Sequence, residues 1–128
     1  MMGNFPLMAM LPASDIERAK AWYADKLGLT PVREDPGGLE YNSGGQRFAV
    51  YPSEFAGTNK ATAAAFEVDN LDKAVDDLSS KQVSFEQYDL EFLKTDERGI
   101  ADFEGWKGAW FKDSEGNILA ISEGPPDK

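Results

Sequence analysis

The chain contains no cysteine and no histidine. Without cysteine it can form no disulfide framework, no thiol nucleophile and no thiolate metal site. Without histidine it lacks the side chain that most often performs acid–base catalysis near neutral pH, and the commonest nitrogen ligand of zinc, iron, nickel and copper. The usual means of building a transition-metal enzyme are therefore missing from the composition.

Basic residues are also scarce. The chain carries 13 lysines and arginines against 23 acidic residues, which gives a formal net charge of -10. Such a protein repels phosphate backbones and anionic membrane surfaces, so we expect neither nucleic acid nor membrane as a partner. The first residues, "MMGNFPLMAML", show no leader pattern, and no apolar run approaches the ~20 residues that span a bilayer. We expect a cytoplasmic protein.

The first half of the chain has a clear helix flanked by strands. Residues 14–28, "SDIERAKAWYADKLG", have helical apolar spacing. Ser14 and Glu17 form an S-x-x-E capping box, and Gly28 is a good C-terminal stop. An apolar strand is predicted before the helix, at residues 5–11. Three short strands are predicted after it, at 30–34, 38–43 and 46–53, with a hairpin turn at "SGG" between the last two.

The second half repeats this order. Residues 15–19 match residues 70–74 in chemical character, with Asp69 or Asn70 as the cap of the second helix. The repeat indicates two copies of a strand–helix–strand–strand–strand unit within one domain of 128 residues. The predicted modules are about 4–55 and 60–123 of the single domain 1–128. In the second module the strands are expected at 62–68, 82–87, 108–112 and 117–122, and the helix at 69–80.

The segment 88–107 follows neither periodicity and is long for a connection. It carries Tyr88, Phe92, Phe103 and Trp106. Two interpretations stay open. The segment is either a loop whose apolar side chains anchor it over a sheet edge, or a flap that faces a ligand.

Three stretches carry a family likeness: "MLPASDIERAKAWYADKLGL" (10–29), "AFEVDNLDKAV" (65–75) and "FKDSEGNILAIS" (111–122). Together they resemble the vicinal oxygen chelate superfamily, which includes glyoxalase I, the extradiol dioxygenases, and the fosfomycin- and bleomycin-resistance proteins. The resemblance implies an α+β fold, with two tandem βαβββ modules that form a cupped, open mixed β-barrel with the helices outside. It does not specify a reaction.

The family's enzymes hold a metal in this cup through histidine, glutamate or glutamine side chains. The resemblance maps those four positions onto Met8, Val50, Ala63 and Ala120. A thioether suits only soft metals, and the other three side chains offer no donor. Because a catalytic metal needs about three protein ligands, we expect no metal and no cofactor at this site.

The same strands predict a concave surface. Strand alternation puts Met8 and Met10 on the cup side of the first strand, and Ala120 on the cup side of the last. Trp110 offers a stacking plane and one N–H donor. The small residues leave room for a ligand cavity, although a filled core is the other interpretation. The predicted ligand-binding residues are Met8, Met10, Phe48, Val50, Ala63, Ala65, Phe92, Phe103, Trp106, Trp110 and Ala120.

The bleomycin-resistance proteins also lack the metal site, and the resemblance implies that they bind a bulky antibiotic in clefts built by a homodimer. We therefore predict a metal-free homodimer that binds or sequesters a hydrophobic or aromatic small molecule such as an antibiotic, without catalytic residues. One alternative is a metal-independent lyase or isomerase that uses a pocket carboxylate, with Glu67, Asp102 and Glu104 as candidates. The other is a dimerising module with a filled cup and no ligand.

Overall fold

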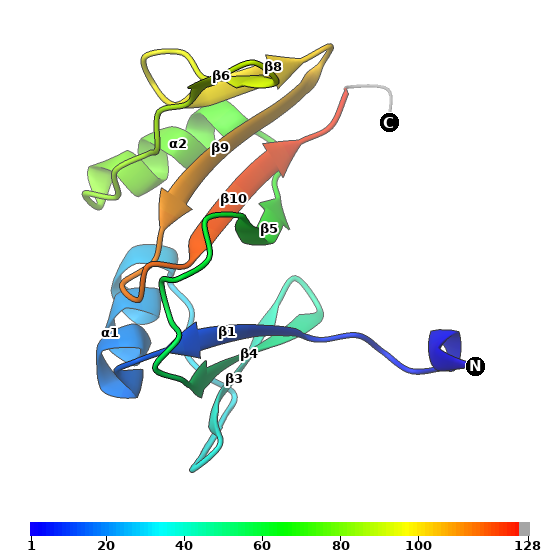
Figure 1. The fold of residues 1–128 in the computed structure, drawn as a ribbon, viewed down its shortest axis with the longest axis vertical. Helices are drawn as coiled ribbons and strands as arrows, with labels where there is room; N and C mark the ends of the chain where they lie inside the picture. Colours follow the sequence, from blue (N-terminus) through cyan, green and yellow to red (C-terminus); the bar gives the residue numbers. More distant parts are fainter. Residues whose placement is uncertain (126–128) are drawn as a thin grey trace.

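The computed structural model describes residues 1–125, so the last three residues of the expected domain lie outside it. The structure consists of two four-stranded sheets, each with one helix, and a small two-stranded sheet (Figure 1). The strand orders are β1-β4-β3-β2 and β5-β10-β9-β8. The element bounds are η1 Met2–Asn4, β1 Ala9–Ala13, α1 Ile16–Leu27, β2 Arg33–Asp35, β3 Gly38–Ser43, β4 Gln46–Pro52, β5 Thr62–Glu67, α2 Leu71–Ser80, β6 Asp89–Leu90, β7 Leu93–Lys94, β8 Ile100–Phe103, β9 Trp106–Lys112 and β10 Ile118–Glu123.

The two sheets have the same topology. In each sheet the first strand of the module runs parallel to the last, β1 beside β4 and β5 beside β10, and the other pairings are antiparallel. The predicted α+β fold with two βαβββ modules is confirmed. Over residues 1–125 the sheets stay separate and open, and they form no closed barrel. None of the helices described is long and apolar enough to cross a membrane.

The two helices begin in the same way. Asp15 and Asn70 have nearly equal backbone angles, and each side chain accepts a hydrogen bond of 3.0 Å from the amide three residues later. Asn70 was one of the two predicted caps. The capping box at Ser14 is wrong, because Asp15 is the N-cap and the Ser14 hydroxyl donates instead to Glu115 Oε1 at 3.3 Å. Gly28 ends α1 in the left-handed region, with φ of 67°, as predicted.

One predicted strand is absent and an unpredicted one replaces it. Residues 82–87 make only a single bridge, between Phe85 and Phe111. The place beside β9 is taken by β8, which belongs to the segment 88–107 that was predicted to be a long connection. Strand β8 shows no clear pattern in the sequence because it is short and lies between two turns. Asp96 Oδ1 accepts hydrogen bonds from the Arg98 and Ile100 amides in the first turn, and Gly105 has a positive φ in the second.

The first strand is also displaced from its prediction. It covers Ala9–Ala13 rather than residues 5–11. Its first pair is Ala9 with Phe48, and β4 begins only two residues earlier, so residues 5 and 6 lie beyond the end of β4 and have no strand to pair with. In Figure 1 this N-terminal stretch extends away from both sheets.

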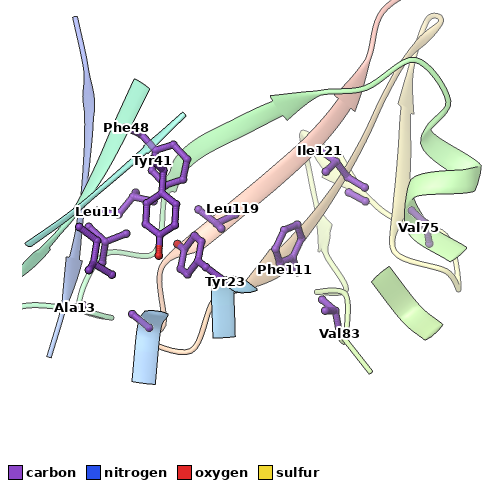
Figure 2. Packing of buried hydrophobic residues seen from close by; sticks show 14 of the residues in the cluster. Leu11, Ala13, Tyr23, Tyr41, Phe48, Val75, Val83, Phe111, Leu119 and Ile121 are labelled. Carbon is purple, nitrogen blue, oxygen red and sulfur yellow. The ribbon is translucent and has the colours of Figure 1, made fainter. Parts of the chain in front are cut away.

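Helix α1 joins the two modules into one core. The Tyr23 ring lies 5.5 Å from the Tyr41 ring in the first sheet, and the Trp22 ring lies 6.3 Å from the Phe111 ring in the second. Figure 2 shows Tyr23 between Tyr41 and Phe111, close to Leu119. The helix-facing sides of both sheets therefore contribute to one cluster of buried residues. The opposite, outer sides of both sheets point away from that core.

Candidate functional site

A cavity of about 720 Å³ lies between the two modules, which we call the inter-module cleft. It is bordered by β1 and β5, each of which is the edge strand of its sheet. Its apolar wall includes Leu11 and Phe48 from the first module, and Ala64, Phe66 and Leu119 from the second. Residues from both sides of the edge strand β5 line it, Ala64 and Phe66 from the helix-facing side and Ala65 from the outer side, so the cleft lies across the strand edges between the two sheets.

Polar side chains lie at the part of the cleft formed by the β3–β4 hairpin. Arg47 lines it and is held by Glu40 at 3.7 Å and by a weak contact of 3.8 Å to the Met8 sulfur. Gln46 also lines the cleft, and Glu67 does so from β5. The site therefore combines an apolar wall with a few polar groups, which is the usual form of a small-molecule site.

Four of the predicted ligand-binding residues line this cleft, namely Met8, Phe48, Ala63 and Ala65. Phe48 reaches it with little of its surface, because its side chain is only 9% exposed and its ring stacks on Tyr41 at 4.9 Å. The cleft-lining residues that the sequence did not predict include Leu11, Ala64, Phe66, Leu119 and Arg47. Alternation places the first four on the helix-facing side, where sequence alone suggests ordinary core.

Met10 and Val50 lie on opposite sides of the first sheet. Met10 is 51% exposed on the outer side, in register with Ala49. Val50 is in register with Leu11 and is 1% exposed inside the core. The alternation predicted for Met10 and Leu11 agrees with this placement, but Val50 is not on the same side as Met10.

The outer side of the second sheet carries a row of aromatic residues, which we call the aromatic wall: Phe103, Trp106 and Trp110. Phe103 and Trp106 are directly paired and are 43% and 44% exposed. The Trp110 indole lies over Gly108, where an added Cβ would come within 3.2 Å of the ring. Its N–H donates to the Thr62 hydroxyl at 3.1 Å, so the predicted donor is already engaged within the chain. The ring face, not the N–H, is the part of Trp110 that could contact a ligand.

The remaining predicted residues either lie away from the inter-module cleft and the aromatic wall or are buried. Tyr88 packs edge-on against Trp110 with ring centroids 5.7 Å apart. Ala120 shares the outer side with Trp110, its partner in the β9–β10 pairing, but is only 6% exposed. Phe92 is 86% exposed between β6 and β7. The segment 88–107 thus supplies part of the aromatic wall from β8 and β9.

The four positions that would hold the family's metal do not converge in one chain. Met8 and Ala63 line the cleft, Val50 is in the core of the first module, and Ala120 is on the outer side of the second. Across residues 1–125, no group of three or more acidic side chains is arranged to hold a metal ion, and the chain has no histidine or cysteine. These side chains do not fit a divalent metal, which requires oxygen, nitrogen or thiolate donors.

Solved structures share this architecture. A glyoxalase/bleomycin resistance protein/dioxygenase from Alicyclobacillus acidocaldarius matches with a TM-score of 0.72 at 16% identity, over 97% of this chain and 94% of that one. A glyoxalase family protein from Enterococcus faecalis gives 0.71 at 23% identity, over 96% and 100%. TnmS3, an antibiotic binding protein from Streptomyces sp. CB03234, gives 0.68 at 18% identity, over 94% and 97%. At these identities the likeness establishes the fold alone.

Sequence comparison identifies the family. Among curated proteins no sequence matches the chain. The model of the Glyoxalase/Bleomycin resistance protein/Dioxygenase superfamily matches residues 7–121, which include both modules and almost every element of the two sheets. The chain belongs to the Glyoxalase/Bleomycin resistance protein/Dioxygenase superfamily.

Proposed function

We propose that the protein binds a hydrophobic or aromatic small molecule in the inter-module cleft, without a metal. The observation that carries this proposal is the cleft itself, whose volume of about 720 Å³ falls within the range of roughly 300–1,000 Å³ common for ligand sites. Its wall is largely apolar and comes from both modules. Burial of an apolar ligand there removes apolar surface of both partners from water, which is the main source of affinity.

Sequestration without chemical change is the form of binding that we propose. The positions that hold a metal in the family's enzymes carry Met8, Val50, Ala63 and Ala120, which do not form a donor set. The structural neighbours include TnmS3, an antibiotic binding protein. An antibiotic or a similarly bulky apolar compound is therefore the ligand class that we propose for this chain.

We also propose that the protein works as a homodimer. The outer sides of both sheets carry apolar side chains that are half exposed in a single chain, including Met10, Phe103 and Trp106. Large apolar side chains that are exposed in this way often mark an interface. Both outer sides point away from the chain's own core, so a second copy could bring the aromatic wall of one chain against the Met10 side of the other. Such pairing would form the cup that one chain leaves open.

Titration with 1-anilinonaphthalene-8-sulfonate (ANS), an aromatic probe, tests binding in the cleft. We expect saturable binding at one probe per chain, read by probe fluorescence. The probe should be recovered chemically unchanged by liquid chromatography and mass spectrometry. Ala64→Phe fills part of the cleft and should weaken binding about tenfold, since a clash or lost cavity surface is worth 1–3 kcal/mol. The matched control is Ala24→Phe, an exposed position on α1.

Equal affinity of the Ala64→Phe and Ala24→Phe variants would place the probe elsewhere. Unfolding temperatures of both variants show whether either substitution disturbs the fold rather than the site. If no saturable phase is seen with the unmodified protein, the proposed function is wrong.

A catalytic role for Glu67 is the second candidate, because Glu67 is an acidic residue that lines the cleft. A metal-independent lyase or isomerase would use it as the base that removes a proton from bound substrate. In that case a product accumulates with the unmodified protein. Glu67→Gln then abolishes product formation while binding remains. Unchanged recovery of every bound compound contradicts this candidate.

A further inference from the structure

A second cavity of about 370 Å³ lies beside the inter-module cleft. Ser43 and Phe66 line both, so the two cavities meet at these side chains. The second cavity is formed between the C-terminal ends of α1 and α2 and the helix-facing side of the second sheet. Its apolar lining includes Leu27, Leu78 and Phe111. The cleft and the second cavity are therefore adjacent, and the space that their side chains line extends from the β3–β4 hairpin to the C-terminal ends of the two helices.

The helix end of this space is lined by two lysines, Lys26 and Lys81. The Lys26 ammonium donates to the Lys81 carbonyl oxygen at 2.7 Å and lies 3.3 Å from Asp25. Lys81 is the C-cap of α2, and over residues 1–125 its own ammonium makes no ion pair. Asp77 also lines this cavity, but its carboxylate is paired with Lys73 at 2.7 Å. In a chain of net charge -10, this end offers an uncompensated cation next to an apolar space.

The end at the β3–β4 hairpin is less favourable for an anion. Its one cation, Arg47, already faces Glu40 at 3.7 Å. Glu67, a second acidic residue, lines the same cavity. A molecule with one acidic group and a long apolar body therefore gains most by placing the acid at the lysines and the body in the two cavities.

We propose that the ligand is an elongated amphipathic acid, a long apolar chain that ends in a carboxylate, with its acidic group at Lys81 and Lys26. This inference rests on the proposed function, since it assigns a ligand class to the same cleft and extends that site into the second cavity. Hydrogen bonds from an ammonium to a carboxylate are stronger than those between neutral groups, and they fix which end of the molecule enters.

Displacement of ANS by dodecanoate and by dodecanol, each below its aggregation concentration, tests the assignment. We expect dodecanoate to bind about tenfold tighter than dodecanol, because only the acid gains the charge-assisted contact. Hexanoate, which is too short to fill both cavities, should bind far more weakly than dodecanoate. Lys81→Gln should remove the preference for the acid over the alcohol, whereas Lys81→Arg should preserve it.

Lys60→Gln is the matched control, because Lys60 is an exposed lysine of the linker between the modules. It should leave the affinities for acid and alcohol unchanged. Equal affinities of dodecanoate and dodecanol, or a loss of preference in the Lys60 variant as large as in the Lys81 variant, would overturn the inference while the proposed function stands. If ANS itself shows no saturable binding, the inference and the proposed function both fail.

Discussion

Two buried tyrosines differ in how their hydroxyl groups are satisfied. The Tyr23 hydroxyl donates to Asp113 Oδ2 at 2.6 Å, which links α1 to the β9–β10 turn. The Tyr41 hydroxyl is buried and has no hydrogen-bond partner over residues 1–125. Burial raises the pKa of Tyr41 to about 12, with a further contribution from Glu34. Tyr41 therefore stays neutral at any physiological pH, and its hydroxyl contributes little to stability.

Removing each hydroxyl should have opposite consequences. Tyr23→Phe breaks a bond to a charged group and leaves Asp113 with one partner fewer, which should lower the free energy of unfolding by about 2 kcal/mol. Tyr41→Phe removes an unsatisfied buried group and should leave that free energy unchanged or raise it. Urea unfolding of the two variants measures both. A larger loss from Tyr41→Phe than from Tyr23→Phe would contradict these hydrogen-bond assignments.

Glu115 also links the two modules. Its side chain is fully buried, and it accepts hydrogen bonds from the Arg18 guanidinium, the Ser14 hydroxyl and the Asp15 amide. Burial alone would raise the pKa of this carboxyl. The hydrogen bonds from Arg18, Ser114 and the Asp15 amide outweigh burial and lower the pKa from 4.5 to about 2.

This depressed pKa predicts how stability depends on pH. A carboxyl whose pKa is lower in the folded state stabilises the fold fully above its unfolded pKa, and that contribution is lost as pH falls through the folded pKa. For Glu115 the loss should therefore occur between pH 4.5 and about 2. Glu115→Gln should lower the free energy of unfolding at pH 7 by about 1–2 kcal/mol, since Arg18 is half exposed and the pair is partly screened.

Unfolding temperatures of Glu115→Gln and the unmodified protein, followed from pH 7 to pH 2, measure this effect. The difference between them should be constant down to about pH 4.5 and should then shrink. Glu34→Gln removes an exposed partner of Lys20 and serves as the control, with little effect at pH 7. A difference between Glu115→Gln and the unmodified protein that does not change with pH would show that the carboxyl is not held ionised as described.

At the scale of elements, sequence patterns located both helices and the β3–β4 hairpin because these have strong local signals. Helical spacing marked α1 and α2, and "SGG" marked the turn in which Gly44 and Gly45 take positive φ. The same rules failed for residues 82–87. Alternating apolar residues there looked like a strand, but Gln82 has a φ of 68° and the edge of β9 is occupied by β8.

The candidate site was only partly predictable for a related reason. Alternation separates the two sides of one strand, and it assigned Met10 and Leu11 to opposite sides as observed. It does not say which sides of two different sheets meet. Ala64, Phe66 and Leu119 therefore looked like core, although they line the cleft. Lys81, whose ammonium makes no ion pair within residues 1–125, carried no pattern in the sequence that set it apart.

The N-cap residues of the two helices, Asp15 and Asn70, should each contribute to stability. Asp15→Ala and Asn70→Ala each remove a side-chain acceptor for an amide in the first turn of a helix. Each should lower the free energy of unfolding by about 1 kcal/mol. Ser14→Ala should act instead through the hydrogen bond from Ser14 to Glu115. Its effect on the free energy of unfolding should therefore largely disappear in a Glu115→Gln background. The effect of Asn70→Ala should persist in that background. Chemical unfolding of the single and double variants gives the coupling, and an effect of Ser14→Ala that is unchanged in that background would contradict its assigned role.

For the whole molecule, the outer sides of the sheets are the surfaces that a second copy would cover. Trp106→Asp places a charge on the aromatic wall and should weaken self-association about tenfold or more, because a buried unpaired charge is costly at an interface. Ala24→Asp adds the same charge on α1, away from both outer sides, and should have no such effect. Light scattering across a dilution series measures both. Equal behaviour of the two variants would remove the aromatic wall from the interface.

Binding of an apolar small molecule in the cleft without a metal can be measured by native mass spectrometry. The protein is treated with chelator and then mixed with ANS. We expect one ANS per chain, at the unmodified polypeptide mass, and much less ANS retained by Ala64→Phe. Failure to retain ANS after chelation, with binding restored by a divalent metal, would contradict metal-free binding and return the chain to the metal-dependent members of its superfamily.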